Sequence, residues 1–174
     1  MISIAEIEAA IDRLAAEVRR DLTVRPLTVL GVLNGSLMFV ADLMRKLNQP
    51  HQLGLIQVSS YRGPVTQPGS LRINSEFLPA IAGRDVLLLD DILDTGRTLA
   101  ALVNLLHQQS PASVRTAVML WKRCRTEVDI HPDYVGFEIP DQFVVGYGLD
   151  YDGDYRHLPY IGVVNFDGAS TTGT

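Results

Sequence analysis

Apolar residues recur along the chain with two spacings, one typical of helices and the other of buried strands. Isoleucine and leucine at helical spacing, with charged residues between them, predict an amphipathic helix that begins after Ser3 and ends near Arg20. Ser3 and Glu6 have the spacing of a capping box, in which each side chain accepts the other residue's backbone N–H. Two further helices, each with one apolar face, are predicted over residues 37–47 and 98–109.

Short, nearly continuous apolar runs lie between these helices. Runs of this length, bounded by Gly, Pro or Asn, favour strands that are buried on both faces of a sheet. The predicted strands cover residues 27–33, 53–60, 85–89 and 114–121. Strands that alternate with helices indicate right-handed βαβ units, and therefore an α/β fold with a mostly parallel twisted sheet flanked by helices.

The rest of the chain is more irregular. Residues 61–84 contain Gly and Pro at several points and one short alternating piece near residue 71, so they form either a lid over a site or a plain connection. The last residues, 168–174, are predicted to be frayed. Three short strand-like pieces are expected to form a cap over the sheet. They cover residues 134–137, 143–145 and 160–164.

Composition limits the classes of function. With 174 residues the chain suits one domain, and 15 Lys and Arg against 20 Asp and Glu give a formal net charge of −5. An acidic domain lacks the basic face that nucleic acids and anionic lipids require, and no apolar stretch reaches membrane-spanning length, so neither partner is expected. Cys124 is the one cysteine, which favours a reducing, cytoplasmic location, and it is expected to be a small buried residue.

The most informative polar segment follows the strand at residues 85–89 and leads into a helix. Its polar and glycine residues are Asp90, Asp91, Asp94, Thr95, Gly96, Arg97 and Thr98. Glycine lets the backbone approach a ligand, and the free N–H groups at a helix N-terminus bind phosphate. Two adjacent carboxylates repel each other unless a cation or hydroxyl groups face them, and a ribose beside Mg²⁺ meets that need. The segment therefore predicts a site for a sugar phosphate with a good leaving group.

Residues 86–98 resemble the phosphoribosyl-diphosphate (PRPP) signature of type I phosphoribosyltransferases. The signature is an apolar run, two acids, two apolar residues, Asp, a hydroxylic residue, Gly, any residue and Thr. Four downstream segments resemble the hypoxanthine-guanine phosphoribosyltransferase family. They are Trp121–Arg123, Asp133–Pro140, Phe143–Tyr151 and Tyr155–Arg156. The resemblance spans about residues 27–164, nearly the whole chain.

This resemblance implies the type I phosphoribosyltransferase fold, with a small hood formed by N- and C-terminal segments. One domain would span residues 1–174, with a core at about 27–121 and a base-binding hood segment at about 122–164. The implied reaction depends on Mg²⁺ and converts PRPP and hypoxanthine or guanine to IMP or GMP and pyrophosphate. A homodimer or homotetramer is also implied. The alternative is a PRPP-sensing regulatory protein of the same fold.

For the ribose phosphate and the metal, the resemblance implies specific residues. Asp90 and Asp91 would contact the ribose hydroxyls, directly or through Mg²⁺. Thr95, Gly96, Arg97 and Thr98 would hold the 5′-phosphate.

For the purine, the resemblance gives Asp94 as the carboxylate facing N7 and as the general base or acid. Lys122 would donate to O6, Phe143 would stack on the ring, and the backbone of Val144 would read the base edge. Asp150 would lie by the base site, near a second Mg²⁺ and the pyrophosphate.

For the pyrophosphate and the lid, the resemblance gives a loop with Asn34 and Gly35, together with Arg156. Many family members have a basic residue at position 34 and a cis peptide bond in this loop. Because Asn34 is uncharged, its contact is expected to rely on backbone N–H groups. Ser60 and Tyr61 match the loop that closes over the site, which favours a lid over a plain connection.

The regulatory alternative predicts a different pattern of residues. A sensor would keep the acidic pair and the phosphate loop but could lose Asp94, Lys122 or the lid, and it would usually carry a basic surface. This chain keeps all three features and is acidic, so an enzyme is expected.

Overall fold

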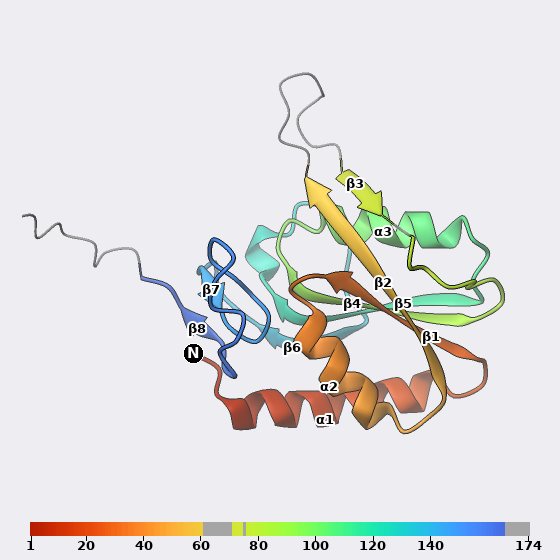
Figure 1. Ribbon diagram of the computed structural model, residues 1–174, viewed down its shortest axis with the longest axis horizontal. Coiled ribbons are helices and arrows are strands. Elements are labelled where there is room, and N and C mark those ends of the chain that lie inside the picture. Colours follow the sequence, from red (N-terminus) through yellow and green to blue (C-terminus); the bar gives the residue numbers. More distant parts are fainter. Residues whose placement is uncertain (61–70, 75, 166–174) are drawn as a thin grey trace, which may run out of the picture.

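A six-stranded sheet forms the centre of the molecule, and helices cover both of its faces (Figure 1). The computed structural model describes residues 1–60, 71–74 and 76–165. Its helices are α1 (Ile4–Asp21), α2 (Leu37–Leu47), α3 (Arg97–His107) and the short 3-10 helix η1 (Arg123–Arg125). Its strands are β1 (Leu27–Leu33), β2 (His51–Ser60), β3 (Leu71–Asn74), β4 (Asp85–Leu93), β5 (Ser113–Trp121), β6 (Tyr134–Glu138), β7 (Val144–Val145) and β8 (Gly162–Val163).

The order of the strands creates a place for a ligand. The order is β3-β2-β1-β4-β5-β6, and every neighbouring pair is parallel except β2 with β3. From β1 the chain passes through α2 to β2 on one side, and from β4 it passes through α3 to β5 on the other. The two loops that leave β1 and β4 therefore diverge, and in such sheets ligands bind where they part. The predicted α/β fold is confirmed.

Two hydrophobic layers explain why the strands are almost continuously apolar. Leu87 and Leu89 of β4 face the layer formed with α1 and α2, whereas Val86 and Leu88 face the layer formed with α3. Successive strand residues point to opposite faces, so a strand covered on both sides needs apolar residues at every position. This burial holds the carboxyl ends of β1 and β4 in fixed positions.

The predicted start of the first helix is confirmed. Ser3 N donates to Glu6 Oε2 at 2.8 Å, and Glu6 N donates to Ser3 Oγ at 3.4 Å, which completes the capping box.

The strand before the acidic pair is longer than predicted. β4 does not end at Leu89, because Ile92 and Leu93 continue to pair with β5. Asp90 and Asp91 are therefore strand residues, and the sheet itself holds their backbone.

The segment at residues 134–137 does not lie in a cap, and this prediction is wrong. As β6 it extends the main sheet, with Tyr134 beside Ala117 and Phe137 beside Leu120. It covers the edge that β5 would otherwise expose. The sheet core therefore continues past the predicted limit at residue 121, and the hood begins after β6.

The hood consists of β7 and β8, which pair antiparallel beside the N-terminus (Figure 1). Ile2 N donates to Ile161 O at 2.9 Å, and Ile161 N donates to Ile2 O at 3.0 Å, so both ends of the chain contribute to it. The predicted frayed tail and Tyr61 of the predicted lid lie outside the described residues. Within the described ranges, no helix is long and apolar enough to cross a membrane.

Candidate functional site

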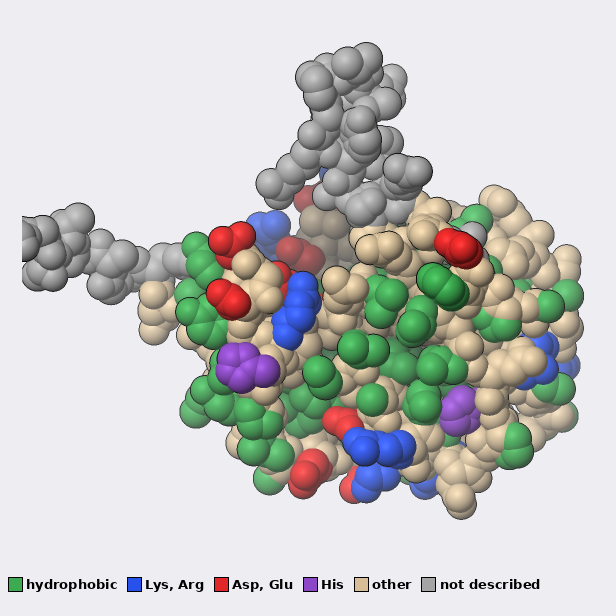
Figure 2. Space-filling view, in the orientation of Figure 1, with side chains coloured by type: hydrophobic (Ala, Val, Ile, Leu, Met, Phe, Trp, Pro, Cys, Tyr) green, Lys and Arg blue, Asp and Glu red, His purple; other side chains and the backbone are tan. Residues whose placement is uncertain are grey.

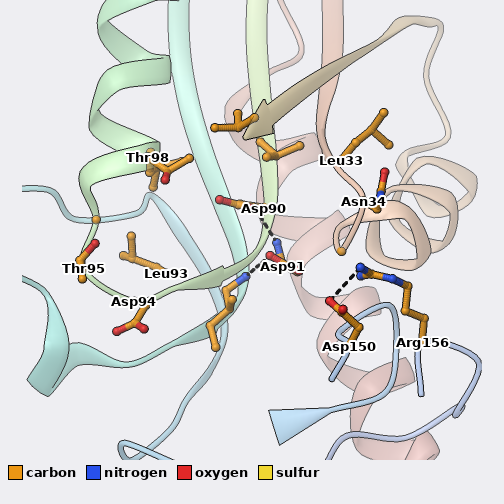
Figure 3. A pocket seen from close by; sticks show the side chains of 16 residues that line it. Leu33, Asn34, Asp90, Asp91, Leu93, Asp94, Thr95, Thr98, Asp150 and Arg156 are labelled. Atoms are coloured by element: carbon orange, nitrogen blue, oxygen red, sulfur yellow. Dashed lines mark hydrogen bonds and ion pairs between the residues drawn. The ribbon is translucent and has the colours of Figure 1, made fainter. Parts of the chain in front are cut away.

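A cavity of about 380 Å³ opens where the chain leaves β1 and β4 (Figure 3). Many of the predicted ribose-phosphate, pyrophosphate and catalytic residues line it. They are Asn34, Gly35, Asp90, Asp91, Asp94, Thr95, Gly96, Thr98, Asp150 and Arg156. They come from three separate parts of the chain, which the fold brings to one place.

The acidic pair lies at the base of this cavity. Asp90 is buried, and its Oδ1 accepts the backbone N–H of Asp91 at 3.0 Å, while Asp91 Oδ1 accepts the N–H of Ile92 at 2.8 Å. Burial raises the pKa of Asp90 well above its ordinary value, and the neighbouring Asp91 carboxylate raises it further. Burial also raises the pKa of Asp91. The positive charge near these two carboxylates is therefore too small to offset the effect of burial on their pKa values.

The loop after β1 packs directly against Asp91. The peptide bond between Leu33 and Asn34 is cis, as the resemblance implied. A Cβ on Gly35 would lie 1.5 Å from Asp91 Oδ2, so only glycine fits there while Asp91 keeps its place. Ser36 Oγ donates to Val32 O at 2.6 Å and ties the loop back to β1. The backbone of the predicted pyrophosphate loop and the acidic pair thus form one wall of the cavity.

The N-terminus of α3 forms another wall. Gly96 has a φ of 83°, and a Cβ there would lie 2.7 Å from Val128 Cγ2, so both its conformation and its surroundings require glycine. Among the described residues no side chain caps this end of the helix, and Thr98 lines the cavity. Free N–H groups and the helix dipole make this end suitable for a phosphate.

Arg97 does not extend this wall with its side chain. Its guanidinium pairs with Glu127 at 2.7 Å, and Arg97 is absent from the residues that line the cavity. In this structure its guanidinium is directed to Glu127, while its backbone N–H lies at the start of α3.

The hood supplies the remaining charged groups. Arg156 Nη2 lies 2.8 Å from Asp150 Oδ1, and Arg156 Nη1 donates to Gly148 O at 2.6 Å (Figure 3). In the space-filling view, acidic and basic side chains lie next to one another over the hood loops (Figure 2). Arg156 therefore adds positive charge opposite the acidic pair, and its Coulombic effect lowers the pKa of Asp91 in part.

The predicted purine residues do not all line the same cavity. Lys122 is buried and follows β5, and its Nζ lies 3.5 Å from Asp141 Oδ1. Phe143 is exposed and lies edge-on to Tyr151, with 5.6 Å between ring centroids, and Val144 lies in β7. Asp94 is the one predicted purine residue besides Asp150 that lines the cavity.

Two charged residues that no motif marks, Arg125 and Asp141, are linked to Asp94, Arg125 directly and Asp141 through Arg125. Arg125 Nε donates to Asp94 Oδ1 at 3.0 Å, and Arg125 Nη1 lies 3.5 Å from Asp141 Oδ2. From the sequence alone, either Arg123 or Arg125 could face Asp94. The turn of η1 directs Arg125 to it. The expectation that Cys124 is buried is wrong, because this turn exposes it.

The donor groups at the cavity suit a hard divalent cation. Asp90, Asp91 and Asp150 offer carboxylate oxygens. Burial is the main cause that raises the pKa of the first two, and a bound cation would act in the opposite direction. Among the described residues, no group of three or more His, Cys, Asp or Glu could hold a metal ion by itself. Mg²⁺ usually binds one or two protein carboxylates together with substrate phosphates and water.

Comparison with known proteins gives consistent matches. The model of the phosphoribosyl transferase domain family matches residues 3–152. A hypoxanthine phosphoribosyltransferase of Salmonella typhimurium is 41% identical over 170 residues, which cover 94% of this chain and 93% of the relative. A hypoxanthine-guanine phosphoribosyltransferase of Staphylococcus epidermidis is 40% identical over 164 residues, covering 94% and 92%. The crystal structure of a Staphylococcus aureus hypoxanthine phosphoribosyltransferase has a TM-score of 0.90 and 37% identity, covering 98% of this chain and 93% of the other.

Proposed function

This chain belongs to the phosphoribosyl transferase family, and from that membership we propose that it transfers the 5-phosphoribosyl group of PRPP to hypoxanthine or guanine. The products are IMP or GMP and pyrophosphate, so the enzyme acts in purine salvage. The observation that carries the proposal is the cavity that is lined both by the acidic pair, Asp90 and Asp91, and by the N-terminus of α3. The relatives named hypoxanthine and hypoxanthine-guanine phosphoribosyltransferase support the choice of bases.

PRPP fits the three walls of the cavity. The 5′-phosphate binds the N–H groups at the start of α3, near Thr98, because these groups carry the positive end of the helix dipole. The ribose hydroxyls face Asp90 and Asp91. The pyrophosphate lies between the backbone at Gly35 and the guanidinium of Arg156.

The charges around the ribose favour its reaction. The bond between C1′ and the pyrophosphate oxygen breaks, and its electron pair leaves with pyrophosphate. N9 of the base then bonds to C1′, and the N7 proton passes to the carboxylate of Asp94. C1′ becomes electron-poor in between, and fixed carboxylates nearby stabilise that charge. Asp94 lies on the same cavity, 41% exposed, so a base entering from solvent can reach it.

The choice of base depends on Lys122. An ammonium group donates to O6 of hypoxanthine or guanine, whereas adenine presents an amino group at the same position. The N–H of Lys122 that points to the base would then have no acceptor there, at a cost of about 1–3 kcal/mol. Lys122 and Asp94 each follow one residue of the matched pair Trp121 and Leu93, so both lie at the same end of the sheet.

Magnesium is part of the proposal. Asp90, Asp91 and Asp150 would hold Mg²⁺ together with oxygens of PRPP. When bound, the ion neutralises charge on the ribose and pyrophosphate oxygens. The predicted homodimer or homotetramer and the predicted cytoplasmic location stay predictions.

The experiment that tests the function measures turnover of hypoxanthine, guanine, xanthine and adenine with PRPP and Mg²⁺. We expect IMP and GMP with release of pyrophosphate, and at least tenfold lower kcat/KM for adenine. A protein that binds PRPP but converts none of the four bases would contradict the enzyme and favour the PRPP sensor. The comparisons offer no support for that alternative.

A further inference from the structure

Four charged side chains of alternating sign form a continuous line beside the cavity. Asp94 Oδ1 accepts from Arg125 Nε at 3.0 Å, Arg125 Nη1 lies 3.5 Å from Asp141 Oδ2, and Lys122 Nζ lies 3.5 Å from Asp141 Oδ1. The line connects the two groups that the proposed function assigns to N7 and O6 of the purine. Arg125 and Asp141 have no assigned part in that function.

The sheet sets the spacing between the two ends of the line. Leu93 of β4 pairs with Trp121 of β5, so Asp94 and Lys122 each follow one member of a matched pair. Lys122 N donates to Leu93 O at 2.9 Å, which continues this register beyond the strands. Their backbones are therefore held by the sheet, whereas their side chains need other groups to orient them.

The turn of η1 brings Arg125 to Asp94. Arg125 N donates to Lys122 O at 2.9 Å and closes the turn. Thr126 Oγ1 accepts from Trp121 Nε1 at 2.9 Å and donates to Asp94 O at 3.3 Å, so the residue after Arg125 is tied to both strands. These contacts direct Arg125 toward the cavity. Arg123 points elsewhere: its guanidinium lies 5.3 Å from the centre of the Trp121 ring.

The two oxygens of the Asp94 carboxylate differ in their surroundings. Oδ1 accepts from Arg125 at 3.0 Å, and within the described part of the chain Oδ2 has no hydrogen bond or ion pair. A guanidinium N–H bonded to one carboxylate oxygen restricts rotation of the group and strengthens the contact through charge. One oxygen is thus committed to Arg125, and the other is available to a ligand proton.

We propose that Arg125 is a positioning residue, which orients the Asp94 carboxylate toward N7 of the purine and, through Asp141, keeps it aligned with Lys122. The inference rests on the proposed role of Asp94. The hydrogen bond and charge of Asp94 are the main causes that raise the pKa of Arg125, and the charge of Asp141 adds to them. Arg125 itself need not touch the substrate.

The first test compares Arg125→Ala with Arg123→Ala, which removes a neighbouring arginine from the same turn. We expect Arg125→Ala to lower kcat with hypoxanthine by about tenfold or more, since the charge-assisted hydrogen bond that orients the Asp94 carboxylate is lost. The KM for PRPP should stay within about twofold. Arg125→Lys should recover part of kcat because it keeps a charged donor. Arg123→Ala should match the unaltered protein, since its partner is Glu138 at 3.8 Å.

A double-mutant cycle separates positioning from a structural role. In an Asp94→Asn background, Arg125→Ala should have little further effect on kcat, because the carboxylate that it orients is already gone. An equal loss of kcat in both backgrounds would overturn the proposal. So would an Arg125→Ala protein that unfolds at lower temperature and loses PRPP affinity in parallel with kcat.

These results are distinguishable from failure of the function itself. If the unaltered protein converts no base, the proposed function is wrong, and the positioning role falls with it because it rests on the role of Asp94. If it converts hypoxanthine and Arg125→Ala does so at the same rate, only the positioning role is wrong.

Discussion

Asp90 illustrates how the fold changes the chemistry of a single residue. A carboxylate at the end of an apolar strand is placed below the surface, next to a second carboxylate. Burial disfavours its charged form, so its pKa is raised. The free protein therefore holds this group at a cost to its stability, which a bound cation and ribose would relieve. The carboxylate that the proposed function requires at this position therefore lowers the stability of the free protein.

Replacing Asp90 with Asn tests whether this carboxylate lowers the stability of the free protein. The pKa of Asp90 in the folded protein lies above the ordinary value of about 3.9. The protonated group therefore contributes fully to the free energy of unfolding below that ordinary pKa, and this contribution is lost as the pH rises through the folded pKa. Asp90→Asn should remove this pH dependence and raise the free energy of unfolding at neutral pH. Urea unfolding with a chelator present, at several pH values between about 4 and 8, measures it. Equal pH slopes for both proteins would contradict the expectation.

Lys122 is the residue expected to determine which bases the enzyme accepts. Lys122→Ala removes the donor to O6, so kcat/KM for hypoxanthine should fall by about tenfold or more while that for adenine changes little. The ratio of the two kcat/KM values is the measurement. Arg123→Ala, which removes the exposed neighbouring charge, serves as the control. An unchanged ratio in Lys122→Ala would remove this residue from base recognition.

At the level of elements, the hood meets the loop after β1 through backbone contacts. Tyr147 OH donates to Asp42 Oδ2 at 2.7 Å, which anchors the hood to α2. The next residue, Gly148, has a φ of 96°, and a Cβ there would lie 2.1 Å from Gly35 O. Arg156 donates to the carbonyl of the same Gly148. One glycine therefore sets the distance between the hood and the predicted pyrophosphate loop.

Gly148→Ala should separate these two elements. The added methyl group meets backbone, which cannot move without shifting Gly35 and, through it, Asp91. We expect the KM for PRPP to rise about tenfold, in line with the loss of about one strong contact. Gly83→Ala is the matched control, because Gly83 also has positive φ, at 69°, but a Cβ there meets nothing within 4 Å. An equal rise in both variants would point to backbone strain alone.

At the level of the whole molecule, α1 and α2 cover one face of the sheet and α3 covers the other (Figure 1). The cavity is lined in part by the layer that contains α3, through Thr98 and Leu99, whereas none of its lining residues belongs to the described helix α1. Leu14 of α1 is fully buried, whereas Ile4 of the same helix is 48% exposed. Changes in the buried face of α1 should therefore affect stability and leave the site unchanged.

Leu14→Ala and Ile4→Ala test this separation. Leu14→Ala should lower the free energy of unfolding by about 2–5 kcal/mol, because it removes apolar contacts and leaves a cavity. Ile4→Ala should cost less than about 1 kcal/mol, because the side chain is half-exposed. Urea unfolding gives both values, and steady-state assays well below the melting temperature should give unchanged KM values. A large KM change in Leu14→Ala would contradict the separation.

The positions of the helices and strands in this protein follow largely from local patterns of apolar residues. Apolar periodicity predicted α1, β1, α2 and β5 within a few residues, because each is covered by the core on a face or stripe that the pattern records. It ended β4 too early, because Asp90 and Asp91 look like turn residues in sequence and only the pairing with β5 keeps them in the strand. The same periodicity wrongly placed β6 in the cap, because a local sequence pattern does not show which strand another strand pairs with.

The sequence by itself also determined the chemistry of the site: its acidic pair, its glycines, and the order of residues that marks the family. Only the tertiary structure decided which charges meet. Arg97 lies within the predicted phosphate segment yet pairs with Glu127, while Arg125, which no motif marks, reaches Asp94. The physical reason is that a side chain's partners depend on the direction in which its backbone presents it. In this region that direction is set by the register of β4 and β5 and the turn of η1.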